Sequence, residues 1–286
     1  MHFFATFNAG FAFFCRFSGK LVEPTGPGQQ TRSNQNNMLK PERQAFILHR
    51  VNLHNQVHSA NLSQELDVSE DTIRRDLQEL ADHNRLIKVH GGALSLSFND
   101  FNHPTAHVYA HAHKKLIARK AAALIQNDMF VLTSGGTTLI ELARHLPPTL
   151  KATFISGSLP VALEYSLHPL IDVILIGDKV SKNSKITVGG EAIAKIKQIK
   201  ADICFLGVNA IDAQHGVTDN DWEVVQVKKA MIESAQKVIC LTISEKINSF
   251  QPFHVCPVEE IDILITELSP EDPRLDPYQK KGIRIL

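Results

Sequence analysis

The chain has 286 residues, of which 43% are hydrophobic and 21% charged, a globular composition with room for one large or two ordinary domains. Its 30 basic and 30 acidic residues cancel, so no global basic excess indicates nucleic acid, and such a function must depend on a local surface. No segment approaches the roughly 18–20 uninterrupted apolar residues of a membrane span, so no membrane partner is expected.

The first 37 residues differ from the rest. "MHFFATFNAGFAFFCRFSGK" is rich in Phe, but Asn8 and Arg16 interrupt it and no basic region precedes its apolar run, which argues against a signal peptide. The stretch at 23–37, rich in Gly, Pro, Gln and Asn, cannot bury a core. We expect residues 1–37 to be disordered, or to be upstream sequence read from a misassigned start.

The cysteines indicate a reducing compartment. Cys15, Cys204, Cys240 and Cys256 form no C-x-x-C pair and no zinc spacing. They are typical of reduced, mostly buried thiols in a cytoplasmic protein.

Residues 38–95 show the pattern of a small helical module. A helix is expected at 41–55, with Pro at a first helical position, and a second short helix at 60–66. Ser69 is expected to cap a third helix. The stretch "LIKVHGGAL" at 86–94 predicts a strand, a Gly-Gly turn and a return strand. This order of elements predicts a winged helix-turn-helix.

The third helix carries two adjacent arginines. With Ile73 on the buried stripe and about 100° per residue, Arg75 must face solvent and Arg74 must flank the core. A helix-turn-helix places the start of its last helix in the major groove, where guanidinium and hydroxyl groups donate to phosphates or guanine edges. The alternative is a solvated face held by pairs such as Arg75–Glu79.

The run "LSQELDVSEDTIRRDLQELADHNRLIKVHGGAL" resembles the DNA-binding signature of the DeoR family of bacterial transcriptional regulators. It covers the helix-turn-helix, the "TIRRDL" run and the "HGGA" wing without a gap. The resemblance implies that Thr72, Arg74 and Arg75 contact the operator, while the hairpin lies near a flanking backbone or minor groove. The predicted contacts to double-stranded operator DNA are Ser69, Thr72, Arg74, Arg75, Lys88 and His90.

The charge of this module limits its affinity. Residues 38–100 contain seven Lys or Arg and nine Asp or Glu. A single module should therefore bind weakly, and affinity should come from two or more modules on one operator, which implies a homo-oligomer.

Residues 96–112 show no clear period and are expected to form a linker, and from 113 apolar strands alternate with helices. This alternation predicts a mostly parallel, two-sided α/β sheet. The expected strands are 129–133, 152–156, 171–177, 201–208, 237–243 and 261–266, with helices at 114–126, 139–146, 159–167, 191–199 and 223–236 between and before them.

The loop "SGGTT" at 134–138 joins the first of these strands to a helix. Glycines allow backbone approach, and hydroxyls and free N–H groups at a helix start point to one anion. The loop matches neither the P-loop nor the dinucleotide motif, so a nucleotide is not indicated. The alternative is an ordinary tight turn.

Residues 113–266 look like the effector-sensing domain of the same family, which is similar to ribose-phosphate isomerases and CoA transferases. The family commonly has "DSGTT" where this chain has "TSGGTT", so Thr133 replaces the usual acidic residue. Further family positions fall at 154–160, 188–190 and 201–232. The implied effector is a phosphorylated sugar. Its predicted contacts are Ser134, Gly135, Gly136, Thr137, Thr138, Ser156, Gly157, Ser158, Gly189, Asn209, Asp212, Gly216, Thr218, Lys228 and Lys246.

Two of these assignments have alternatives that the sequence leaves open. Asp212 could only cap a turn, and Lys228 could be a solvated helix residue. Because Lys228 and Lys229 are adjacent on a helix, only one of them can enter a pocket.

An enzyme is the main rival interpretation. Isomerase relatives carry an "Asp-x-Ser-Lys" type run after a late strand, where this chain has "TISEKI". Ile243 stands where the aspartate is expected, and an isoleucine cannot move a proton, although Asp212 and Glu223 could still act as bases. We predict a non-enzyme, with a sugar-phosphate isomerase-like enzyme fused to a DNA-binding module as the alternative. A second rival is an architectural DNA-binding protein whose α/β part merely oligomerises.

Four histidines, His103, His107, His111 and His113, cluster near the predicted domain junction. If 107–111 is helical, two of them lie four residues apart, a spacing that suits a metal. No H-E-x-x-H motif or nearby cysteine supports a metal, so a polar linker or pH-sensitive surface is favoured. No metal or cofactor is predicted.

The sequence thus predicts a two-domain, cytoplasmic transcriptional regulator, a repressor of sugar-metabolism genes. The predicted parts are the extension 1–37, the winged helix-turn-helix 38–95, the linker 96–112, and the effector-binding and oligomerisation domain 113–286. Derepression and activation by the effector are both compatible with the sequence.

Overall fold

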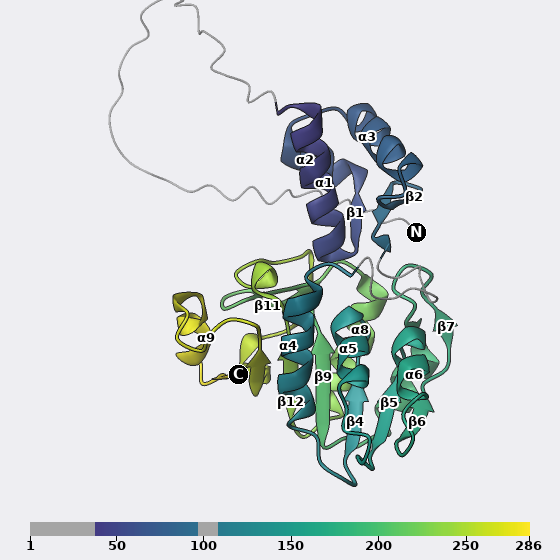
Figure 1. Cartoon of the computed structure of the whole chain (residues 1–286), viewed down its shortest axis with the longest axis vertical. Helices are drawn as coiled ribbons and strands as arrows, with labels where there is room; N and C mark the ends of the chain where they lie inside the picture. The colour runs from purple at the N-terminus through teal and green to yellow at the C-terminus, as the bar shows by residue number, and fades with distance from the viewer. Residues whose placement is uncertain (1–37, 97–107) are drawn as a thin grey trace, which may run out of the picture. The chain divides into compact units, whose positions relative to one another are not determined.

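The computed structural model describes residues 38–96 and 108–286 (Figure 1). The predictions for residues 1–37, Cys15, His103, His107 and most of the linker lie outside the described residues. Within the described ranges, none of the helices combines the length and hydropathy needed to cross a bilayer.

The N-terminal module is a three-helix unit with a small antiparallel sheet in the order β1-β3-β2. Its apolar core joins all three helices and the hairpin, with Ile47, Leu62, Ile73 and Leu77 at most 2% exposed. The predicted helices and hairpin are confirmed, and the three-residue strand β1 was not predicted. The elements are α1 (Lys40–His54), β1 (Gln56–His58), α2 (Ser59–Leu66), α3 (Glu70–Asp82), β2 (Ile87–Val89) and β3 (Gly92–Leu94).

The "HGGA" turn depends on both glycines. Gly91 has φ +75°, a left-handed conformation that L side chains rarely adopt. Gly92 pairs with His58, and a Cβ built on it would lie 1.9 Å from the Val57 carbonyl oxygen. Only a residue without a side chain lets β3 approach β1 this closely.

The C-terminal domain is built on a seven-stranded sheet in the order β15-β14-β12-β9-β4-β5-β6, and all its pairings are parallel. The chain starts at β4, adds β5 and β6 on one side, and then builds outward from β9 on the other. The order therefore reverses between β4 and β9. The strands are β4 (Phe130–Thr133), β5 (Thr153–Ser156), β6 (Asp172–Leu175), β9 (Ile203–Gly207), β12 (Val238–Leu241), β14 (Ile263–Ile265) and β15 (Arg284–Ile285).

Helices cover both faces of this sheet, so the predicted α/β class is confirmed. One cluster packs α4, α5 and α6 on one face, and another packs α7 and α8 on the other. The helices are α4 (His111–Ala122), α5 (Thr137–Arg144), α6 (Leu159–Tyr165), α7 (Gly190–Ile196), α8 (Trp222–Glu233) and α9 (Asp276–Gln279), with 3-10 turns η2 (Ser244–Lys246), η3 (Val258–Glu260) and η4 (Pro273–Leu275).

Two smaller sheets lie outside the predicted pattern, because their strands are short. They are the pair β7 (Lys179–Val180) and β8 (Thr187–Val188), and the three strands β10 (Ala210–Asp212), β11 (Gly216–Asp219) and β13 (Phe253–Cys256).

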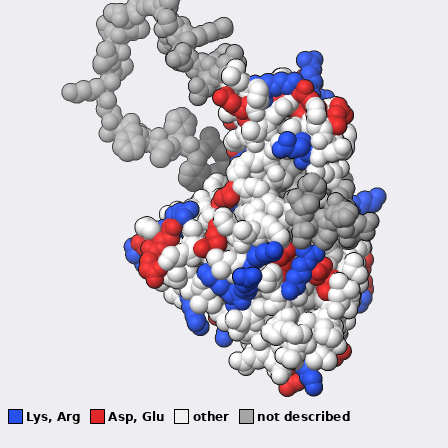
Figure 2. All heavy atoms as spheres, in the orientation of Figure 1, with Lys and Arg blue, Asp and Glu red and all other residues white. Residues whose placement is uncertain are grey.

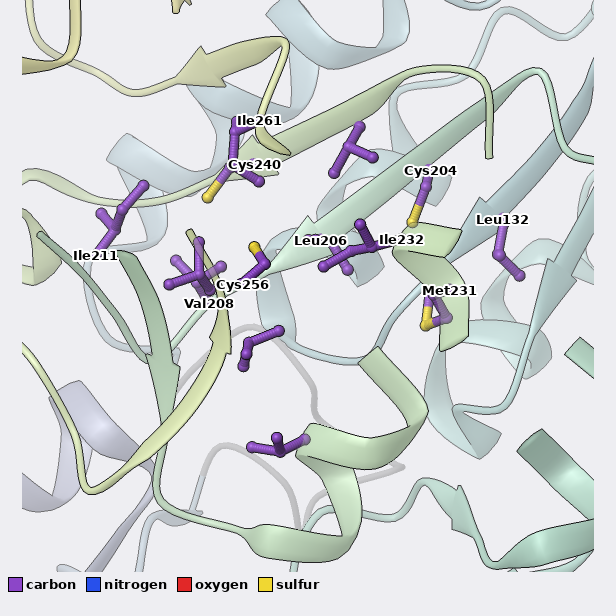
Figure 3. Packing of buried hydrophobic residues seen from close by; sticks show 14 of the residues in the cluster. Leu132, Cys204, Leu206, Val208, Ile211, Met231, Ile232, Cys240, Cys256 and Ile261 are labelled. Carbon is purple, nitrogen blue, oxygen red and sulfur yellow. The ribbon is translucent and has the colours of Figure 1, made fainter. Parts of the chain in front are cut away.

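Three of the four cysteines lie in the larger core cluster (Figure 3). Cys204, Cys240 and Cys256 are free thiols no more than 2% exposed. Burial raises the pKa of all three, that of Cys256 to about 12, so none is a reactive thiolate at neutral pH. The prediction of buried, reduced thiols is confirmed for these three.

Candidate functional site

The start of α3 presents the predicted DNA-reading residues. Ser69 caps the helix as predicted, because its Oγ accepts the Thr72 N–H at 3.2 Å. Ile73 is fully buried, and Arg74 and Arg75 are both exposed. Arg74 lies further out than its predicted flanking position, with 60% of its side chain exposed and an ion pair to Asp71 at 2.9 Å.

The pair Arg75–Glu79, the solvated-face alternative, does not form. Glu79 instead accepts hydrogen bonds from Lys40 at 2.8 Å and from Gln44. Within the described ranges, no hydrogen bond or ion pair holds the Arg75 guanidinium, so it is available to an outside acceptor. Behind this face, the buried carboxylate of Asp76 pairs with Arg43 of α1 and fixes α3 in place.

The hairpin is less free than α3. Lys88 donates to Gln78 of α3 at 2.8 Å, and His90 is exposed at the turn. Acidic side chains also lie among the basic ones over this module (Figure 2). Basic and acidic side chains are thus mixed on this surface, and weak binding of DNA by one module stays a prediction.

The second site is a pocket at the carboxyl ends of β4 and β9, where the strand order reverses. Open α/β sheets bind ligands at this topological position. Residues of the C-terminal domain that line the pocket are Lys114, Gly135, Gly136, Thr137, Thr138, Asn183, Ser184, Ile186, Gly207, Val208, Asn209, Asp219, Asn220, Asp221, Val224, Lys228, Leu241, Thr242, Ile243 and Lys246.

The "SGGTT" loop forms one wall. Ser134 ties the loop to β9, because its Oγ accepts the Gly207 N–H at 2.8 Å. Gly136 has φ +125°, and a Cβ on Gly135 would lie 2.7 Å from Ile186 Cδ1. Helix α5 then begins at Thr137 with no side-chain cap. The N–H groups of a first helical turn lack intrahelical partners, so this wall offers donors to an anion.

Lys228 lies inside the pocket rather than in solvent. Its Nζ donates to Asp219 at 2.6 Å and to the Gly207 carbonyl at 2.8 Å, and only 6% of its side chain is exposed. Burial opposes ionisation of Asp219, but Lys228 and donors from Asn209 and Asn220 outweigh it, so the Asp219 pKa stays below its usual value.

Two further lysines bring positive charge to the pocket. Lys246 Nζ donates to the Val208 carbonyl at 2.9 Å, and burial together with the Lys228 charge lowers its pKa to about 8. Lys114, from α4, is 7% exposed, and burial followed by the Lys246 charge lowers its pKa to about 7. Within the described ranges, neither ammonium forms an ion pair with a carboxylate; Lys114 Nζ lies 6.0 Å from the Tyr109 ring centroid. The described lining thus contains three lysines and two carboxylates, Asp219 and Asp221, so basic side chains are in excess in this pocket.

Lys114 was not predicted from the sequence. It lies 20 or more residues before the "SGGTT" loop in the sequence, and its helix α4 has the pattern of an ordinary amphipathic helix. Lys114 is the first residue of the buried stripe of α4, and burial of a lysine there becomes a signal only when the fold is known.

The remaining predicted effector residues do not line the pocket. Most are held in structural contacts: Ser156 Oγ donates to the Thr133 carbonyl at 2.9 Å, Asp212 Oδ1 accepts from Gln214 and His215 N–H, and Thr218 Oγ1 accepts the Gln251 N–H at 2.8 Å. The full set outside the lining is Ser134, Ser156, Gly157, Ser158, Gly189, Asp212, Gly216 and Thr218.

Two glycines of this set have steric reasons for their identity. A Cβ on Gly216 would lie 2.2 Å from the Cys256 carbonyl oxygen, and one on Gly189 would lie 2.6 Å from Asp178 Oδ2. Asp178 also accepts the Ala192 N–H at 3.0 Å, so the N-terminus of α7 already has an acceptor.

The two histidines of the predicted cluster that lie in the described ranges are both close to carboxylates. His111 Nε2 lies 3.1 Å from Glu141 and His113 Nδ1 lies 3.4 Å from Glu267. Across residues 38–96 and 108–286, no group of three or more His, Cys, Asp or Glu is arranged to hold a metal ion.

A winged helix-turn-helix followed by an α/β domain with a pocket at its sheet reversal is the architecture of a DNA-binding regulator with a sensor domain. Comparison with known families agrees: residues 43–98 match the DeoR-like helix-turn-helix domain, and residues 109–268 match the DeoR C terminal sensor domain. The chain belongs to the DeoR family of DNA-binding transcriptional regulators.

Similar proteins cover nearly the whole chain. It is 30% identical to the HTH-type transcriptional regulator GolR of Listeria innocua over 87% of this chain and 98% of that protein. It is 30% identical to the HTH-type transcriptional repressor GlcR of Bacillus subtilis over 87% and 96%. It is 27% identical to the glycerol-3-phosphate regulon repressor of Escherichia coli K12 over 82% and 93%.

Proposed function

We propose that this regulator is a repressor of sugar-metabolism genes in the cytoplasm, controlled by a phosphorylated sugar bound in the C-terminal pocket. The observation that carries the proposal is that one pocket combines buried Lys114 and partly buried Lys246 with the uncapped N-terminus of α5. A phosphate group balances the excess of basic side chains and accepts from the N–H groups. The names of the similar repressors from Bacillus subtilis and Escherichia coli support this class of regulated gene.

The pocket also has groups that can form hydrogen bonds with the hydroxyls of a sugar. Asn183, Ser184 and Asn220 line it, and the buried Ser184 Oγ has no partner among the described residues. Hydroxyls and amides both donate and accept, as sugar hydroxyls require. We therefore assign the phosphate to the end with Thr137, Thr138 and the lysines, and the sugar to the end with Asn183 and Ser184.

The operator is proposed to be read by α3. Exposed Arg74 and Arg75 at its start are placed to donate to phosphates and guanine edges, with Ser69 and Thr72 supplying hydroxyls. Because the module is acidic overall, specific binding is proposed to need a homo-oligomer that presents two modules to one operator.

Regulation requires that DNA and effector prefer different arrangements of the protein. We propose that filling the pocket shifts the linker 96–112 and the subunit arrangement, so that paired reading helices lose operator spacing. An effector that bound tightly yet left DNA affinity unchanged would contradict this mechanism.

The positions of the carboxylates favour a function in binding a sugar phosphate over catalytic turnover of it. Asp212 accepts three hydrogen bonds in a turn, and Glu223 is exposed and pairs with Lys179 at 2.8 Å; neither lines the pocket. Of the carboxylates that do, Asp219 is paired with Lys228, and Asp221 caps α8 by accepting from Glu223 N–H at 3.0 Å. No lining carboxylate is left as a ready general base.

Thermal unfolding against a panel of pentose and hexose phosphates tests the proposal. A ligand that binds only the native state raises its stability. At least one sugar phosphate should raise the Tm of the wild type, while the matching unphosphorylated sugar should not. The Lys114→Met variant should lose the effect, and Lys115→Met, on the same helix but outside the pocket lining, should keep it. A panel without any shift would overturn the proposal, and turnover of a sugar phosphate in a coupled assay would favour the enzyme alternative.

A further inference from the structure

The two edges of the seven-stranded sheet differ. One edge is β15, which has two residues and carries Arg284, and short charged edges resist further pairing. The other edge is β6, with four residues of sequence "DVIL" (Figure 1). Its one charge is Asp172 at the start of the strand, and it contains no lysine, proline or bulge, the other devices that protect an edge. Among residues 38–96 and 108–286, no strand pairs with its outer side.

The unpaired backbone groups of β6 can be assigned from its hydrogen bonds. Asp172 N–H donates to the Ala152 carbonyl at 3.0 Å, and Ile176 N–H donates to the Ser156 carbonyl at 2.9 Å, both toward β5. Because successive residues of a strand direct their backbone groups to opposite sides, the N–H and C=O of Val173 and Leu175 face outward. Two donors and two acceptors are thus offered to another strand.

Apolar side chains are exposed along the same edge. Ile174 is 46% exposed and Leu175 is 48% exposed, although they project from opposite faces of the sheet. Helix α6 and its connection to β6 add three exposed leucines. These are Leu163, Leu167 and Leu170, exposed by 56%, 73% and 47%. Exposed apolar residues gathered beside an open strand mark an interaction surface.

We propose that this edge, residues 172–175 with the leucines of 163–170, binds the same edge of a second copy of this chain. In an antiparallel pair related by a two-fold axis at Ile174, each Val173 exchanges hydrogen bonds with Leu175 of the other copy. Ile174 then faces its own counterpart across a non-hydrogen-bonded pair, where side chains come closest. The strand is thereby complementary to itself.

Charge also favours self-pairing. In this register Asp172 lies opposite Ile176 of the other copy, so the two carboxylates do not face each other. The pairing continues the parallel sheet across the axis and is isologous, which is the commonest way to make a closed dimer. The inference does not depend on which ligand the pocket binds.

Charge substitutions at the axis test the pairing directly in the full chain. Ile174→Lys alone and Ile174→Glu alone each place like charges opposite each other, and both variants should sediment at half the wild-type mass or less. Mixing the two should restore the wild-type mass, because Lys then faces Glu. Leu116→Lys, at a comparably exposed leucine of α4, is the matched control and should keep the wild-type mass.

Three outcomes would overturn the proposal: a monomeric wild type, single variants that keep the wild-type mass, or folded variants that do not recombine. The Phe-rich N-terminal segment is the rival partner for this edge. A shortened chain of residues 38–286 lacks that segment and should still associate as the full chain does. Its failure to associate would also overturn the proposal.

Hydrogen exchange tests the same pairing without substitutions. The Val173 and Leu175 amides should be protected in the assembly and should exchange faster on dilution, whereas fast exchange at all concentrations contradicts the pairing.

Discussion

Lys114→Met should make the protein more stable and unable to bind its effector. Methionine has a similar length and removes the buried ammonium. The pKa of Lys114 falls from 10.5 to about 7 in the folded protein, mainly because of burial. At about 1.4 kcal/mol per pH unit, this difference corresponds to roughly 4–5 kcal/mol of cost to the native state at pH 7. Allowing for imperfect packing of the methionine, we expect a gain of about 1–4 kcal/mol in the free energy of unfolding.

The gain should depend on pH with a defined sign. Between about pH 7 and 10.5 the unfolded wild type binds more protons at Lys114 than the folded one, so wild-type stability rises with pH there. The advantage of Lys114→Met should therefore be smaller at pH 9 than at pH 7, by roughly 2 kcal/mol.

Urea unfolding at pH 7 and pH 9, with and without the sugar phosphate found by thermal shift, measures both effects. Lys115→Met is the matched control, because its side chain is partly exposed and does not line the pocket. The reasoning is refuted if Lys114→Met is less stable than the wild type at pH 7, if its advantage grows with pH, or if it is stabilised by the ligand as strongly as the wild type.

Three other substitutions test separate parts of the account. Arg75→Ala should cost about 1–3 kcal/mol of operator binding without unfolding the protein, measured by footprinting and circular dichroism, and a wild-type footprint would remove this arginine from the site. Asp219→Asn leaves the ammonium of Lys228 buried without its partner and should lower the free energy of unfolding by about 3–5 kcal/mol; a loss under about 1 kcal/mol in urea would contradict the buried pair. Gly92→Ala should cost more than Gly91→Ala in thermal unfolding, because its Cβ would meet the backbone of β1, and equal losses would contradict the close approach.

Local patterns predicted most of the framework. The stripe of Ile73, Leu77 and Leu80 and the apolar strands from 129 onward are encoded in neighbouring residues, so their elements were found from the sequence. The strands of the small sheets were missed because two to four residues cannot show a period, and β15 pairs only through distant contacts.

The site was predicted only in part, for a related reason. Residues 135–138 of the "SGGTT" loop, Asn209, Lys228 and Lys246 line the pocket, as expected from the family resemblance and helix-start chemistry. Ser156 and Thr218 have the right chemistry, but their hydroxyls are used by backbone groups. Lys114 was not predicted because residues distant in the sequence bury it in the pocket. The spacing of neighbouring residues does not encode such long-range contacts.

Operator affinity measured against effector concentration tests the central claim most directly. The anisotropy of a labelled operator fragment should be measured while the sugar phosphate that stabilises the protein is titrated in, for the wild type and for Lys114→Met. We predict that the ligand changes the Kd of the wild type for the operator and leaves that of the variant unchanged. A ligand that saturates the wild-type pocket without changing the operator Kd would contradict control of DNA binding through this pocket.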